Sequence, residues 1–176
     1  MEVENDNYQQ GCCSPERGSS VVDSVLHMRR LVTEITIQAS RADVWDALTQ
    51  LERYGEWNPF IIEAKGTIAM GEHLEVKMQQ PGRKPITFRP TVTEVVSGSV
   101  FEWLGHLGVG GIFDGRHRFE LEERDGGTRL THSETFTGII VPLLFRVLER
   151  GTTAGFEAMN AALKTRVESA SQESAE

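Results

Sequence analysis

The sequence predicts an α+β domain in which a curved antiparallel sheet of about seven strands wraps around one long C-terminal helix. Three observations indicate this class. The chain starts with one strand and two short helical segments, runs of alternating apolar and polar residues then follow up to Phe136, and a helical apolar stripe comes last. A meander of this length must bury one face, and only the last helix is long enough to cover it.

The first predicted elements are a strand over residues 31–39 and two short helices. Ser40 followed by Asp43 is typical of a helix N-terminus, because the hydroxyl caps free N–H groups and the carboxylate lies at the positive end of the helix dipole. The second short helical segment, residues 52–57, must end before Pro59, since the residue preceding a proline disfavours helical geometry.

The middle of the chain reads as a series of strands. Alternation of apolar and polar residues predicts them over residues 61–70, 73–79 and 86–92. A hairpin follows at residues 97–98. With a two-residue loop, Trp103 lies opposite Val92 and Leu107 lies opposite Phe88, so the apolar faces of the two strands match.

The last predicted hairpin joins residues 113–121 to residues 130–136 and carries polar side chains on its apolar face. His117 shares one side of its strand with aromatic and aliphatic residues, and His132 and Glu134 do so on the second strand. Ionisable groups are rarely buried without a partner. The inward face therefore marks a candidate site.

The turn of this hairpin decides how the polar groups meet. A loop at Asp125-Gly126 places His117 directly opposite Glu134, whereas a loop one residue later makes the contact diagonal. In either register the two Cβ atoms lie roughly 4.5–8 Å apart.

The chain ends in a long predicted helix over residues 142–167. Its apolar positions recur at intervals of three or four residues and form a stripe about 33 Å long at 1.5 Å per residue. A curved sheet that grips a single helix leaves space between the two, so we expect an internal cavity. The stripe consists of Phe145, Leu148, Thr152, Phe156, Met159, Leu163 and Val167.

Composition limits the possible partners. We expect a disordered tail over residues 1–27, one domain over residues 28–168 and a second disordered tail over residues 169–176. The net charge of −8 comes mostly from the two ends, and the near-neutral body offers no basic face for nucleic acid. No apolar run is long enough to span a membrane and no secretory leader is evident, so we expect a cytoplasmic protein.

Five segments carry a resemblance: Ser40-Arg-Ala-Asp-Val-Trp-Asp-Ala-Leu-Thr49, Glu52-Arg-Tyr-Gly-Glu-Trp-Asn-Pro59, Gly115-Arg-His-Arg-Phe119, Gly127-Thr-Arg-Leu-Thr-His-Ser-Glu134 and Phe136-Thr-Gly138. They resemble the START-like superfamily, also called the birch-pollen-allergen-like (SRPBCC) superfamily, in its polyketide cyclase/dehydrase and lipid-transport branch. The resemblance covers about residues 31–167. It implies the helix-grip fold and a cavity for a hydrophobic ligand, while the superfamily's functions range from carriers and cyclases to chaperone activators.

We therefore expect a small hydrophobic ligand, a lipid or an aromatic or polyketide-like molecule, to bind between the sheet and the last helix. No cofactor is implied, and the oligomeric state is left open. The residues expected to contact the ligand come from inner strand faces, the apolar helix face and the end of the second short helix: Trp57, Phe88, Trp103, Phe113, His117, Phe119, His132, Glu134, Phe136, Phe156 and Met159.

Four interpretations of the polar cluster remain open. His117 and Glu134 can form a structural hydrogen-bonded pair, or a polar contact that orients an apolar ligand. They can also act as an acid–base pair of a cyclase- or dehydrase-like enzyme. Finally, two imidazoles and a carboxylate can form a facial triad for a metal ion, although we expect none here. A chaperone-activator-like interaction protein is a further alternative, and it predicts a filled core with an exposed apolar patch.

Overall fold

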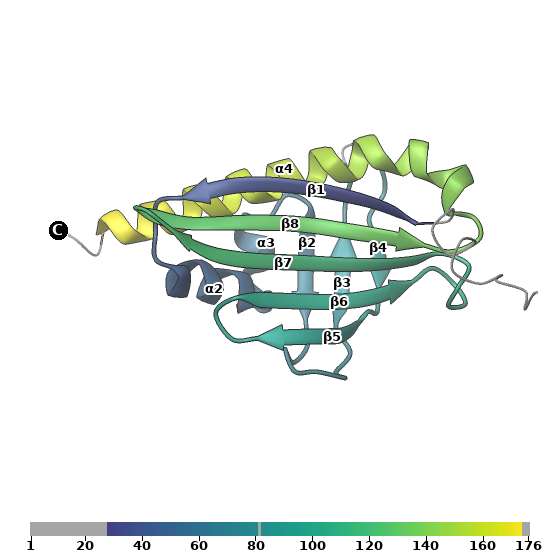
Figure 1. The fold of residues 1–176 in the computed structure, drawn as a ribbon, viewed down its shortest axis with the longest axis horizontal. Helices are drawn as coiled ribbons and strands as arrows, with labels where there is room; N and C mark the ends of the chain where they lie inside the picture. The colour runs from purple at the N-terminus through teal and green to yellow at the C-terminus, as the bar shows by residue number, and fades with distance from the viewer. Residues whose placement is uncertain (1–27, 81, 174–176) are drawn as a thin grey trace, which may run out of the picture.

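In the computed structural model, which describes residues 28–80 and 82–173, eight strands form two antiparallel sheets beside one long helix (Figure 1). The larger sheet has the strand order β1-β8-β7-β6-β5, and the smaller has the order β2-β3-β4. The elements are β1 (Arg29–Ile37), α2 (Arg41–Thr49), the 3-10 turn η1 (Leu51–Arg53), α3 (Tyr54–Trp57), β2 (Ile61–Lys65), β3 (Glu75–Met78), β4 (Ile86–Phe88), β5 (Thr91–Val96), β6 (Val100–His106), β7 (Asp114–Arg124), β8 (Gly127–Thr137) and α4 (Val141–Glu173).

The α+β class, the two short helices after the first strand and the long last helix agree with the prediction. The predicted tail over residues 1–27 lies outside the described residues. At the other end, α4 continues to Glu173, so the described part of the predicted tail over residues 169–176 is helical.

Local signals at the start of the domain act as the sequence indicated. The Ser40 hydroxyl accepts a hydrogen bond from the backbone N–H of Asp43 at 3.2 Å and caps α2. After α3, the side-chain oxygen of Asn58 accepts hydrogen bonds from the N–H groups of Phe60 and Ile61. These bonds turn the chain from α3 into β2.

The strands divide into two sheets, where the sequence suggested one. The predicted strand over residues 86–92 breaks between β4 and β5, where Pro90 has no N–H to donate to a neighbouring strand. The segment just before β3 runs beside the start of β5: His73 and Thr91 form an isolated β-bridge, and the N–H of Leu74 donates to the carbonyl of Pro90 at 2.9 Å.

This break changes one predicted pairing and keeps another. Trp103 lies opposite Val92 as expected, because a bulge after Val92 offsets a hairpin loop that is one residue longer than predicted. The predicted pairing of Leu107 with Phe88 is wrong. Phe88 lies opposite Val76 in the smaller sheet.

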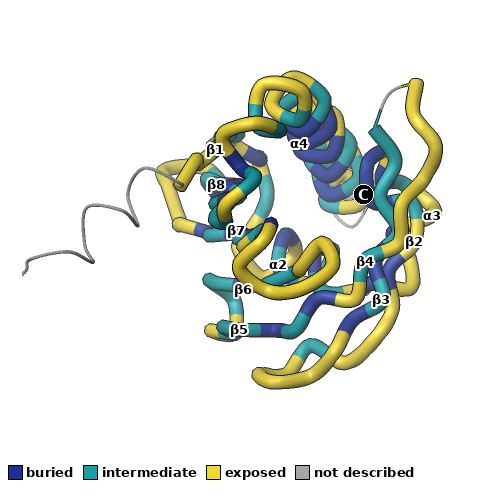
Figure 2. The backbone as a smooth tube through the Cα atoms, turned by 90° about the vertical axis from the view of Figure 1, so that its right-hand side faces the viewer, coloured by how far each residue is buried: buried dark blue, intermediate teal, exposed yellow. Residues whose placement is uncertain are grey.

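The helix α4 closes the curve formed by the sheets. Seen end-on, it lies between the β1 edge of the larger sheet and the smaller sheet, with its buried side turned inward (Figure 2). Phe156, Met159 and Leu163 from this side are fully buried. Gly155 allows close approach, because a Cβ atom there would lie 2.2 Å from the ring of Phe60. The core is therefore built around the second half of α4.

Candidate ligand-binding cavity

The hairpin of β7 and β8 has the first of the two registers considered from the sequence. Arg124 lies opposite Gly127, which makes Asp125-Gly126 the loop. His117 consequently lies directly opposite Glu134. Phe119, two positions further along β7, lies opposite His132. The three polar groups thus share the inner face of one strand pair.

These groups form a continuous hydrogen-bonded series. Nδ1 of His117 lies 3.3 Å from Oε2 of Glu134, and its Nε2 lies 2.7 Å from Nε2 of His132. On the far side, Nδ1 of His132 lies 2.9 Å from Oδ1 of Asn160 in α4. Nδ2 of Asn160 donates to Oγ1 of Thr33 in β1 at 2.9 Å. The series therefore connects β7, β8, α4 and β1.

Aromatic rings enclose the two imidazoles. Trp103 stacks on His117 with ring centroids 4.5 Å apart and an interplanar angle of 5°, and Phe156 stacks on His132 at 3.7 Å and 15°. Phe119 contacts both imidazoles. His117 is 1% exposed and His132 is fully buried, so water has no access to the middle of the series.

Burial sets the charge of each group. It lowers the pKa of His117 to about 3 and lowers that of His132 well below its ordinary value, the latter also through the neighbouring His117. Burial raises the pKa of Glu134 to about 8. At pH 7 all three groups are therefore neutral, and Glu134 is a carboxylic acid.

Beside this series lies a cavity of about 150 Å³ bounded by the smaller sheet, the end of the larger sheet and the first half of α4. Glu134 is the one carboxylate among its described lining residues. Gly115 gives its side chain room, because a Cβ atom at Gly115 would lie 2.4 Å from Oε1 of Glu134. The lining consists of Phe60, Val76, Met78, Gln80, Arg83, Lys84, Ile86, Phe88, Pro90, Trp103, Gly105, His106, Leu107, Phe113, Gly115, Glu134, Phe136, Leu148 and Thr152.

The structure divides the predicted ligand contacts into two groups. Five of them line the cavity: Phe88, Trp103, Phe113, Glu134 and Phe136. The other six pack away from it, in or against the main core: Trp57, His117, Phe119, His132, Phe156 and Met159. Trp57 contacts Tyr54 edge-on at 5.1 Å. Contact of any of the eleven with a ligand stays a prediction.

Sequence reasoning missed several residues of this region. Asn160 follows Phe156 by four positions and so falls on the buried side of α4. A polar amide on this mostly apolar side was the signal that could have marked Asn160 as part of the site. Gln80 and Thr152 line the cavity and are joined by a hydrogen bond of 3.2 Å. Nothing in the local pattern pointed to Arg83 and Lys84, which lie in the segment between β3 and β4.

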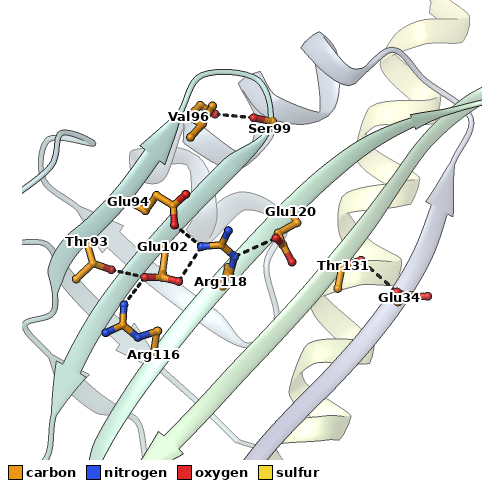
Figure 3. Close-up of polar contacts among 10 residues, drawn as sticks. All are labelled: Glu34, Thr93, Glu94, Val96, Ser99, Glu102, Arg116, Arg118, Glu120 and Thr131. Atoms are coloured by element: carbon orange, nitrogen blue, oxygen red, sulfur yellow. Dashed lines mark hydrogen bonds and ion pairs between the residues drawn. The ribbon is translucent and has the colours of Figure 1, made fainter.

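The opposite face of the larger sheet carries a separate charged cluster, shown in Figure 3. Glu102 is 5% exposed and accepts hydrogen bonds from Thr93 at 2.7 Å, from Arg118 at 2.9 Å and from Arg116. Burial alone would raise the pKa of Glu102, but these bonds outweigh it and lower the pKa. We therefore assign this cluster to the stability of the sheet.

The polar series does not form a metal centre. His117 lies in the middle, with its Nδ1 facing Glu134 and its Nε2 facing His132. The three side chains therefore lie in a row and do not converge on one point. In the described ranges, no three His, Cys, Asp or Glu side chains are grouped to hold a metal ion.

The fold and the cavity together define a helix-grip protein with an internal pocket. Residues 28–168 match the sequence model of the polyketide cyclase / dehydrase and lipid transport family, and the chain belongs to this family. No curated protein matches the chain. No helix of the described residues is long and apolar enough to cross a membrane.

Solved structures share the fold at low identity. The ZhuI aromatase/cyclase of Streptomyces sp. R1128 superposes with a TM-score of 0.66 at 16% identity, over 81% of this chain and 94% of its own. Ara h 8.0201 gives 0.57 at 16%, over 81% and 99%. The di-domain ARO/CYC StfQ of the steffimycin biosynthetic pathway gives 0.62 at 12%, over 82% of this chain, which spans only 53% of StfQ. These likenesses establish the fold alone.

Proposed function

We propose that this protein binds a small, largely apolar molecule in the cavity, with Glu134 as its polar contact. The observation that carries the proposal is the lining, which is mostly aromatic and aliphatic and holds a single carboxyl group; its other polar side chains are Gln80, Arg83, Lys84, His106 and Thr152. Ligand sites of proteins typically combine an apolar wall with a few polar groups that fix orientation. Membership of a family that includes lipid transport is consistent with this function.

The size of the cavity limits the ligand. A dry cavity of about 150 Å³ in another protein holds one benzene ring. The cavity here has the same volume, so it accommodates one ring or a comparable stretch of alkyl chain. A larger lipid or polyketide would have to extend beyond it, past Arg83 and Lys84 in the lining.

Native mass spectrometry of the protein purified from its own host tests the proposal. We expect a co-purifying apolar molecule on the wild-type protein and none on a Gly105→Leu variant. Gly105 lines the cavity, and a Cβ atom there would meet its nearest neighbour, Cβ of Pro90, at an ordinary 3.7 Å. The longer side chain should therefore fill the cavity without distorting the strand. A wild-type protein that carries nothing and binds no ethylbenzene in a titration would contradict the proposal.

A second candidate function is acid–base catalysis on a bound carbonyl compound. It is favoured by the raised pKa of Glu134, about 8, which gives a carboxylic acid able to donate a proton at neutral pH. Its contact with His117 supplies a neighbouring hydrogen-bond partner for the carboxyl group. Loss of turnover in Glu134→Gln with unchanged ligand affinity would distinguish this enzyme from a carrier.

A further inference from the structure

The two carboxyl oxygens of Glu134 have different surroundings. Oε2 faces Nδ1 of His117 at 3.3 Å. Oε1 lies over Gly115, in the wall of the cavity, and makes no hydrogen bond within the part of the chain that the structure describes. A polar group of a bound ligand would therefore meet Oε1. Whether Oε1 can accept or donate depends on where the carboxyl proton lies.

The position of this proton can be followed from the far end of the series. The hydroxyl of Thr33 donates to the backbone oxygen of His132 at 3.3 Å, so Oγ1 is free to accept the bond from Nδ2 of Asn160. Asn160 then presents its oxygen to Nδ1 of His132, which must carry a proton. A neutral imidazole has one N–H, and Nε2 of His132 is consequently an acceptor.

The same reasoning continues through the next ring. Nε2 of His117 must donate to Nε2 of His132 across 2.7 Å, which leaves Nδ1 of His117 as an acceptor. Oε2 of Glu134 must then carry the carboxyl proton and donate it to Nδ1. Oε1 remains as a carbonyl-type oxygen that can only accept.

We infer that the cavity selects apolar ligands that present an O–H or N–H donor to Oε1 of Glu134, and that Asn160 is the positioning residue that sets this preference. The inference rests on the proposed function, since it needs a ligand in the cavity. It adds the chemical class: alcohols, phenols and amines bind, and molecules whose only polar group is a carbonyl bind weakly. A carbonyl turned towards Oε1 would face it without a donor between them, so it would have to turn to another lining donor such as Arg83 or Lys84 and lose the contact with Glu134.

Three probes with one carbon skeleton separate the possibilities. 1-Phenylethanol carries a donor, acetophenone carries only an acceptor, and ethylbenzene carries neither. Calorimetric titration should show 1-phenylethanol binding about tenfold more tightly than acetophenone, the effect of one net hydrogen bond. Equal affinity for these two, or tighter binding of acetophenone, overturns the inference and leaves the proposed function standing. Binding of none of the three overturns the proposed function and the inference with it.

Variants test the direction of the series. In Glu134→Gln the side-chain amide donates to His117 and its oxygen faces the cavity, so the tenfold preference for the alcohol should persist. In Asn160→Leu the acceptor for Nδ1 of His132 is lost. The ratio of the affinities for 1-phenylethanol and acetophenone should then fall towards one, while ethylbenzene still binds. If that variant does not fold, Thr33→Val removes the partner of Nδ2 and should have the same effect. Loss of the preference in Glu134→Gln, or its persistence in both other variants, contradicts the inference.

Discussion

Replacing Glu134 by Gln should stabilise the protein, and the gain should grow as the pH rises. Burial raises the pKa of this carboxyl from 4.5 to about 8 in the folded protein. The unfolded chain releases the proton at the lower value and the folded protein holds it. The stability of the wild-type protein is therefore fully present below the unfolded pKa and is lost as the pH rises through the folded pKa. Glutamine has no proton to lose and avoids this cost.

The size of the effect follows from the shift. Each pKa unit corresponds to about 1.4 kcal/mol, so a shift from 4.5 to about 8 amounts to about 5 kcal/mol above pH 8. At pH 7 the gain should be about 3 kcal/mol by the same relation. Near the ordinary pKa of a glutamic acid the two proteins should be about equally stable, because the carboxyl is then protonated in both states.

Urea denaturation at a series of pH values measures this difference in unfolding free energy. Glu123→Gln is a matched control on the neighbouring strand β7, since Glu123 is exposed and its replacement should change stability by less than about 0.5 kcal/mol at any pH. A difference between Glu134→Gln and wild type that does not vary with pH would refute the reasoning. So would a variant less stable than wild type at high pH, because it would mean that folding favours the ionised carboxylate of Glu134 where burial should disfavour it.

Three other substitutions test the surroundings of the site by the same denaturation assay. Burial lowers the pKa of His117 from 6.5 to about 3, so its contribution to the stability of the fold is present above the unfolded pKa and is lost as the pH falls. His117→Phe should therefore lose less stability in acid than wild type does. An unchanged dependence of stability on acid pH would count against a buried neutral imidazole. Glu102→Gln should cost about 2 kcal/mol by weakening charged hydrogen bonds to Arg118, and a neutral result would mean that the outer cluster contributes nothing. Gly155→Ala should cost about 2 kcal/mol because its methyl group overlaps Phe60, whereas a gain in stability would show that the ring moves freely.

The hairpin illustrates what the sequence could predict. Strand alternation placed His117, His132 and Glu134 on one face and limited the hairpin to two registers, of which the structure has the one with its loop at Asp125-Gly126. These are local properties, decided by residues within about twenty positions of one another. The general fold was predictable for the same reason, since each helix and strand carries its own periodicity.

Depth within the fold was not predictable in this way. Alternation says that His117 and Glu134 point inward, but only the packing of Trp103 and Phe156 shows that the imidazole is sealed from the cavity while the carboxyl borders it. The link from His132 to Asn160 joins two elements far apart in the chain. Pairings of this kind depend on where α4 crosses the sheet, and no local pattern encodes that crossing.

A crystal structure with 1-phenylethanol would show whether Glu134 receives a hydrogen bond from a ligand in the cavity. We expect the phenyl ring to lie among Phe88, Phe113 and Phe136. The ligand hydroxyl should lie about 2.7–2.8 Å from Oε1 of Glu134, the usual separation for an O–H donor and an oxygen acceptor. A ring bound elsewhere, or a hydroxyl turned away from Oε1 inside the cavity, would contradict the account.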